Sequence, residues 1–141
     1  MSINRNFFEV LGNNLFTIPP RDLSGQDFTR ANLSELKLRG VRFKKCNFTE
    51  ADLRNCDISH NDLSYSNFTK ADLRGAILGK YTTFEGSNLT GANLSGLDFF
   101  KVNLRGANLT GANLTNASFF GADITDCVFN KAIISGTKGI K

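Results

Sequence analysis

The residues of this chain that could do chemistry are three cysteines, one histidine and a long series of aspartates and asparagines. Cys46, Cys56 and Cys127 form no C-x-x-C pair, and His60 lies at none of the spacings that a zinc site uses. The sequence contains no Ser-His-Asp set, no Cys-His set and no phosphate-binding glycine loop. These residues therefore predict neither an enzyme nor a metal site, and we expect no cofactor.

The aspartates and asparagines instead mark a repeat. Residues 86–119 read GSNLTGANLSGLDFFKVNLRGANLTGANLTNASF, with a large apolar residue at every fifth position from Leu89 to Phe119. A small or modest residue comes two positions earlier, and Asp, Asn or Ser stands between the two. A period of five is neither the helical 3.6 nor the strand period of 2. Such regular Asp and Asn residues are expected to bond neighbouring backbone at turns rather than to act as acids.

The repeat covers most of the chain. We call the large apolar residue the centre of each unit. Twelve centres run from Leu23 to Leu78, one extra residue enters around residues 80–83, and eleven further centres run from Phe84 to Ile134. The pattern thus predicts 23 units over residues 21–136, with a single register break.

The clearest units spell Ala-Asn-Leu or Ala-Asp-Leu, at residues 31–33, 51–53, 71–73, 92–94, 107–109 and 112–114. In these motifs the sequence resembles the pentapeptide repeat family, whose consensus is A-(D/N)-L-x-x, over more than four fifths of its length. The resemblance implies an all-β fold, a right-handed quadrilateral parallel β-helix (a solenoid) with four units per coil. On that fold the repeats make about six coils, and the rod is about 28 Å long at a ladder spacing of about 4.8 Å.

Three segments follow from this pattern. Residues 1–20 are expected to form an N-terminal cap and link, 21–136 the β-helix, and 137–141 a short tail. Phe7, Phe8, Leu11 and Leu15 fall on one side of a helix, which predicts a short amphipathic helix over Asn6–Leu15. We expect it to cover the open end of the coils, as terminal units of a solenoid require, and a partner-binding helix is the alternative.

Each unit should turn a corner with two side chains inward, the centre and the residue two before it. All three cysteines occupy the smaller inward position and are expected to act as hydrophobic filler, with a redox or metal role as the alternative. His60 falls on an outward position. An odd number of cysteines argues for a reducing compartment. No secretory leader or membrane-spanning run is apparent, so we expect a cytoplasmic protein without membrane contact.

Residues 20 apart should stack in adjacent coils, or 21 apart across the break. One outward column on the fourth face then reads Arg39, Ser59, Gly79, Phe100, Phe120 and Ile140. Val128 and Ile133 are apolar where Asp or Asn is usual, and no helix follows to cover the last coil. Exposed apolar patches usually mark interfaces, so we expect a contact surface and a homodimer through the C-terminal end, with candidate residues Phe100, Phe120, Val128, Ile133 and Ile140. The alternative is that the two rings fold over a corner or that the tail covers them.

The formal net charge is +4, and a basic group stands between Arg30 and Arg54. Its candidate members are Lys37, Arg39, Arg42, Lys44 and Lys45. Phosphate could bind such a patch. However, these charges point from several faces, and we expect no exposed aromatic residues among them to stack on bases. Solvated charge is the preferred interpretation, and nucleic acid is not an expected partner.

The sequence thus favours a non-catalytic bacterial protein that binds another protein or acts as a scaffold, with an unidentified partner. The resemblance implies one alternative, a DNA mimic that binds a type II topoisomerase. Family members of that kind are strongly acidic along one side and carry a C-terminal dimerisation helix. The basic charge and the missing helix disfavour this alternative.

Overall fold

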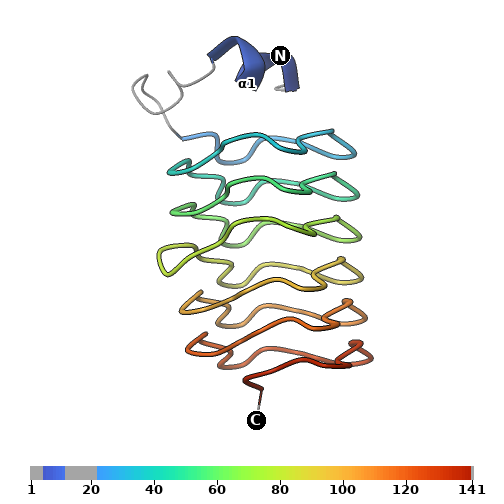
Figure 1. Cartoon of the computed structure of the whole chain (residues 1–141). Helices are drawn as coiled ribbons and strands as arrows, with labels where there is room; N and C mark the ends of the chain where they lie inside the picture. Colours follow the sequence, from blue (N-terminus) through green and yellow to red (C-terminus); the bar gives the residue numbers. More distant parts are fainter. Residues whose placement is uncertain (1–4, 12–21, 141) are drawn as a thin grey trace.

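The structure, a computed structural model, describes residues 5–11 and 22–140 of the chain. It is a rod of stacked coils with one helix, α1 (Arg5–Leu11), across its N-terminal end (Figure 1). Within the described residues every β-pairing is a single-residue parallel bridge, so no strand is longer than one bridge. The bridges begin at Asp22 and end at Lys138.

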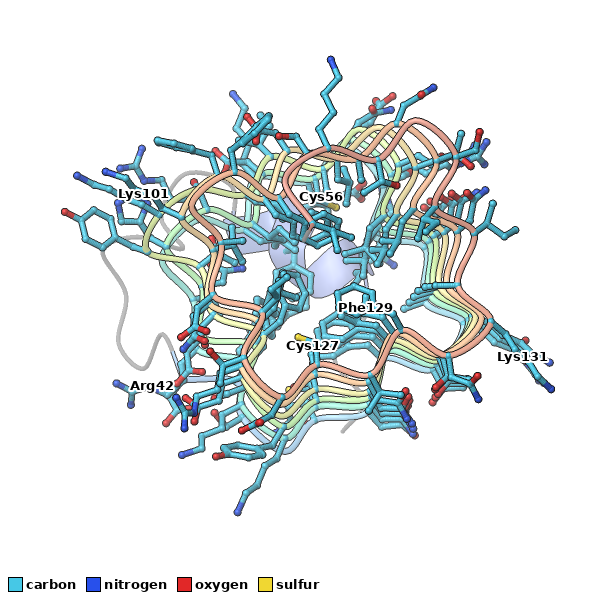
Figure 2. The ribbon with its side chains drawn as sticks, turned by 90° about the horizontal axis from the view of Figure 1, so that it is seen from below. Arg42, Cys56, Lys101, Cys127, Phe129 and Lys131 are labelled. Carbon is cyan, nitrogen blue, oxygen red and sulfur yellow. The ribbon has the colours of Figure 1, made fainter. Side chains whose placement is uncertain are left out.

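The five-residue period closes a coil after four units. The residue before each centre pairs with the residue 20 positions later, as Asp22 does with Arg42 and Asp27 with Asn47. Most centres donate their amide to the coil that follows, as in the 2.8 Å bond from Leu33 N to Asp52 O. Viewed along the axis, the coils superpose as a four-cornered tube with side chains inside and outside (Figure 2). This is the expected quadrilateral parallel β-helix.

A tight turn makes each corner. The carbonyl of the centre accepts the amide of the residue three later, as in the 3.0 Å bond from Ala31 N to Phe28 O. The last residue of the unit takes a positive φ, which is 58° at Arg30. These are the features of a type II turn, which usually takes glycine there. Here twelve non-glycine residues also adopt positive φ, so the corner accepts lysine, asparagine and even tyrosine.

The core is the column of centres together with the smaller inward residues. Phe28, Phe48 and Phe68 stack along the axis with ring centroids 5.0 and 4.8 Å apart. Phe99 and Phe119 repeat this at 4.7 Å further along. All five rings are at most 1% exposed. Because each coil buries its apolar side chains only against its neighbours, stability comes from stacking.

The predicted inward position of the cysteines is confirmed. Cys46 and Cys56 are buried, while Cys127 in the last coil is half-buried. Each thiol donates to a carbonyl of the preceding coil, as in the 2.7 Å contact from Cys56 Sγ to Leu33 O. Ser66 Oγ makes the equivalent bond to Phe43 O at 2.7 Å. The small inward position thus pairs these thiols and this hydroxyl with carbonyls of the preceding coil, whereas Asn61 Nδ2 and Ser87 Oγ, at the same kind of position, are buried without a hydrogen-bond partner among the described residues.

Helix α1 lies against the first coil. Phe8 is 4% exposed, with its ring centroid 6.1 Å from that of Phe28. Arg5 Nη1 donates to Ser34 O at 2.8 Å. The predicted helix over Asn6–Leu15 is thus found as Arg5–Leu11. Its expected continuation to Leu15, like the rest of the predicted link up to residue 20, falls outside the described residues.

The predicted register break is confirmed as one extra residue in the unit 76–81. Asp62 pairs with Thr83 across 21 residues, and pairing across 20 resumes between Thr83 and Asn103. The enlarged corner projects from the wall of the rod, in yellow-green in Figure 1. One consequence was not predicted. The repeat register places a bridge between Ile77 and Asp98. Of the bridges expected from Asp22 to Lys138, this is the one that does not form.

Candidate functional site

Phe100 and Phe120 stand on the outside of the fourth face, one coil apart, as predicted. They are 51% and 56% exposed. Lys101 Nζ lies 5.2 Å from the centroid of the Phe100 ring. The two residues form an apolar strip rather than an aromatic stack.

Ile140 does not extend this strip in the way the column rule suggests. It is half-buried and packs against the core. The reason lies in Gly139, which would be the next centre but has a φ of +80° and sits directly on the backbone of Phe119 and Phe120. A Cβ there would come within 2.7 Å of Phe120 N. The chain therefore turns over the end of the core at this glycine, and Ile140 follows it inward.

The last coil leaves apolar side chains uncovered. Val128, Ile133 and Ile134 are 46%, 52% and 56% exposed. Ile134 is a centre, and the centres at the equivalent position of the preceding coils are buried. Phe129 and Cys127 point into the interior of this coil and are half-buried, and Figure 2 looks onto them from the C-terminal end. These apolar residues form what we call the C-terminal apolar end: the exposed Val128, Ile133 and Ile134 and the half-buried Phe129.

This end also carries an open strand edge. Within the described residues the backbone amides of Ile124, Phe129 and Ile134 donate no hydrogen bond to another coil. Unpaired edges of this kind are templates for pairing with another chain. Apolar surface and free backbone donors thus coincide at one end of the rod.

The candidate basic patch is divided between two faces. Lys37 and Arg39 lie on the face whose centre is Leu38, whereas Arg42, Lys44 and Lys45 belong to the next coil, beside the centre Phe43. Arg42 points outward at one corner (Figure 2) and lies 3.5 Å from Asp22. The bridge to Asp62 places a second aspartate beside it. The positive charge is therefore spread around a corner and partly paired.

One expectation about this patch was wrong. Tyr65 is 51% exposed, and Lys44 Nζ lies 5.7 Å from the centroid of its ring, so an exposed aromatic residue does adjoin the basic group. The ring lies over Gly86, where a Cβ would come within 2.5 Å of it. The spacing of 20 between Lys45 and Tyr65 was the signal that could have revealed this neighbour. A single ring is still far from the series of stacking platforms that single-strand binders use.

The repeated Asp and Asn residues have the structural role that was predicted. Their carboxylate or amide oxygens accept the backbone N–H two residues later, as in Thr49 N to Asn47 Oδ1 at 3.0 Å. Where the residue two positions later is Thr or Ser, its hydroxyl often donates to the same oxygen, at 2.6 Å for Thr49. Hydrogen bonds from Arg54 and Arg74 lower the pKa values of Asp52 and Asp72. These carboxylates are held ionised at turns, which is not what a general acid requires.

The cysteines and the histidine show no reactive arrangement. Burial raises the pKa of Cys46 to about 11 and that of Cys56 to about 12, so the nucleophilic thiolate is absent at neutral pH. The ring of His60 lies 4.9 Å from that of Tyr81 on the outside of the rod. Over residues 5–11 and 22–140, no three His, Cys, Asp or Glu side chains come close enough to hold a metal ion. In the same part of the chain, no helix is long and apolar enough to cross a membrane.

Several solved structures are similar to this chain. Rfr23, a pentapeptide repeat protein from the cyanobacterium Cyanothece, is 23% identical, with 91% of this chain and 98% of that chain covered and a TM-score of 0.42. QnrB1, a plasmid-mediated fluoroquinolone resistance protein, is 19% identical over 79% of this chain and 68% of its own, with a TM-score of 0.48. A pentapeptide repeat protein of the Arabidopsis thaliana thylakoid lumen is 34% identical over 75% and 63%, with a TM-score of 0.24.

No curated protein matches the sequence. The family described as "Pentapeptide repeats (8 copies)" matches over residues 22–44, 42–79, 80–106 and 98–136, which together span nearly all of the coils. The spacing of the bridges, the corner bonds of Asp and Asn, and this match agree: the chain belongs to the pentapeptide repeat family.

Proposed function

We propose that this chain is a non-catalytic protein-interaction module that associates with a second copy of itself through the C-terminal apolar end. The observation that carries the proposal is the exposure of Val128, Ile133 and Ile134 beside free backbone donors in the last coil. At the other end of the rod, α1 lies over the first coil, which supports the expected role of an N-terminal cap. Among residues 5–11 and 22–140 the two ends of the rod therefore differ, and the C-terminal one presents exposed core residues.

A second copy fits this surface better than an unrelated chain does. A two-fold axis through the end would bring each open edge against the other and cover apolar side chains on both sides, and such isologous dimers are the commonest assemblies. Phe100 and Phe120 remain outside this contact, on the side of the rod. They give the fourth face a further apolar strip for another protein partner.

A DNA-mimic function receives no specific support. Mimicry of a phosphate backbone needs a dense row of negative charge, whereas the chain has a net charge of +4 and Arg42, Arg54 and Arg74 form ion pairs with aspartates. A supercoiling assay with a type II topoisomerase serves as a check, and we expect no inhibition.

The dimer is tested by light scattering on size-exclusion fractions of the natural chain and of the double variant Val128→Asn, Ile133→Asn. Asparagine stands at the equivalent place one coil earlier, at Asn108 and Asn113, so the double variant conforms to the repeat. We expect a dimer for the natural chain and a monomer for the variant, with unchanged circular dichroism. The matched control is Ile77→Asn, another apolar residue at an Asn position but far from the end, which should remain dimeric. A natural chain that is monomeric at every concentration would overturn the proposal.

The strip on the fourth face is tested separately with Phe100→Ser and Phe120→Ser combined. We expect this variant to fold normally and to stay dimeric, because neither ring belongs to the core or to the C-terminal apolar end. Loss of the dimer in this variant would show that the contact runs along the side of the rod instead.

A further inference from the structure

The hydrogen-bond ladder between adjacent coils is open over one side of the fourth face. In register, four backbone bonds should join residues 75–80 to the coil that follows: Gly75 N to Ser95 O, Asp98 N to Ala76 O, Leu78 N to Asp98 O and Lys80 N to Phe100 O. None of the four is present in the described structure. The equivalent bonds form one face earlier, for example from Leu73 N to Asn93 O at 3.0 Å.

Both edges of this opening are held firmly on their outer sides. Ile77 N donates to Cys56 O at 2.8 Å in the coil before, and Phe99 N donates to Ser118 O at 2.8 Å in the coil after. The edges therefore keep the extended conformation of a ladder although they do not pair with each other. The opening is part of the fold rather than a frayed end.

Two sequence features coincide at the opening. The unit 76–81 carries the extra residue, which lets the corner at Gly79 swing outward with a φ of +138°. In the following coil Leu97 occupies the small inward position, where it is 2% exposed. A longer corner thus lies above the opening, and a bulkier inward residue lies below it.

The opening is a cleft of about 510 Å³. Its lining is mainly backbone and apolar side chains, including Ile77, Leu78, Leu97 and Phe100. Ile77 is 58% exposed at a position that is normally Asp or Asn, and Phe100 stands at the mouth with half of its surface exposed. Lys80 and Asp98 add one charge of each sign to the rim.

We propose that this cleft binds an extended peptide segment of a partner protein by strand addition. The upper edge offers the amides of Gly75, Leu78 and Lys80, and the lower edge offers the carbonyls of Ser95, Asp98 and Phe100. Only another backbone in a strand conformation carries donors and acceptors at that spacing on both of its sides. In such recognition the main chain supplies affinity, while alternate side chains supply specificity.

The side chains around the cleft define the segment further. An apolar residue would pack on Ile77 and Phe100, and the strip continues to Phe120 one coil later. The opposite charges of Lys80 and Asp98 favour a segment without strong net charge. This inference rests on the proposed interaction function and names the chemistry of a second partner, distinct from the second copy at the C-terminal apolar end.

The experiment selects short random linear peptides on a phage library against the full chain. Counter-selection uses a variant in which Tyr81 is deleted, which restores the five-residue period and closes the ladder. We expect enriched peptides that bind the natural chain and that lose about tenfold or more in affinity for the deletion variant, because several backbone bonds are lost at once. On binding, the amides of Leu78 and Asp98 should become protected from hydrogen exchange.

A second readout does not depend on the deletion variant. Methylation of alternate backbone nitrogens in a selected peptide removes the donors that a strand needs. We expect methylation of one of the two alternating sets of nitrogens to abolish binding, whereas the unmethylated peptide binds. The measurements are repeated on Val128→Asn, Ile133→Asn, whose cleft is intact, so that a failed dimer and a failed cleft are told apart. The proposal is overturned if no peptide is enriched, or if the enriched peptides tolerate methylation throughout or bind the deletion variant equally well.

Discussion

Deleting Tyr81 should stabilise the protein, which is unusual for the loss of a whole residue. The deletion leaves a unit Ala76-Ile77-Leu78-Gly79-Lys80 followed directly by Thr82, so the five-residue period runs unbroken. Lys80 would then occupy the corner position, which lysine already fills at residues 45, 70, 101 and 131 with φ near +58°. We expect the bridge between Ile77 and Asp98 to form.

The magnitude follows from the four backbone bonds that are open in the natural chain. A backbone hydrogen bond contributes about 1 kcal/mol net when water is the alternative partner, which gives roughly 4 kcal/mol. Tyr81 is 61% exposed, and its contacts with His60 and Lys80 are worth about 1 kcal/mol together. The free energy of unfolding should therefore rise by about 3 kcal/mol.

Urea unfolding and native-state hydrogen exchange measure this change. For a small domain the rise should move the urea midpoint upward by at least about 1 M. The amides of Gly75, Leu78 and Asp98 should change from fast to slow exchange. The matched control deletes Gly111 from a regular unit, which breaks the register there and should destabilise the chain. If deleting Tyr81 lowers the midpoint, or if the three amides still exchange rapidly, the extra residue is not what keeps the ladder open.

Three further predictions concern the rest of the rod. Hydrogen bonds from arginine lower the pKa values of Asp52 and Asp72 in the folded state. The two carboxylates therefore stabilise the fold above the ordinary pKa of 3.8, and this stabilisation is lost as the pH falls below that value. Thermal unfolding at stepped acidic pH should show a falling melting temperature, and a flat profile would contradict the prediction. Because burial raises the pKa values of Cys46 and Cys56, both should resist iodoacetamide at mildly alkaline pH until urea unfolds the chain, and rapid labelling of the folded protein would refute their inward placement. Phe8→Ala should cost about 3 kcal/mol, seen as faster hydrogen exchange in the first coil while the last coils keep their protection, and equal loss at both ends would mean that the effect is not local.

Much of the fold could be predicted from the period alone. A large residue every fifth position fixed which side chains point inward, and the one-residue offset near 80–83 correctly changed the pairing distance from 20 to 21. The inward thiols and the corner bonds of Asp and Asn followed from the same register. These features depend only on local sequence and on a repeated geometry, so a single rule covers all of them.

The candidate sites were predicted less completely. The column rule placed Phe100 and Phe120 correctly on the surface, but Ile140 packs inward because the chain turns at Gly139. The contact between Lys44 and Tyr65 could have been found from the spacing of 20 between Lys45 and Tyr65, and it was overlooked. The cleft could not be deduced, because counting residues shows that one is extra but not whether it bulges at a corner or opens the ladder beside Ile77. That outcome depends on the balance between corner strain, the bulk of Leu97 and the lost backbone bonds.

The uniform pairing distance has a consequence for how this chain folds. Every bridge joins residues 20 or 21 apart, so each new coil closes a loop of nearly the same length and meets nearly the same entropic cost. After a first pair of coils has formed, folding can then advance by equal steps in either direction. The opening between Ile77 and Asp98 removes one rung from a single step, and we expect that step to be the slowest. The rod should therefore assemble as two blocks, on either side of the extra residue, which join last.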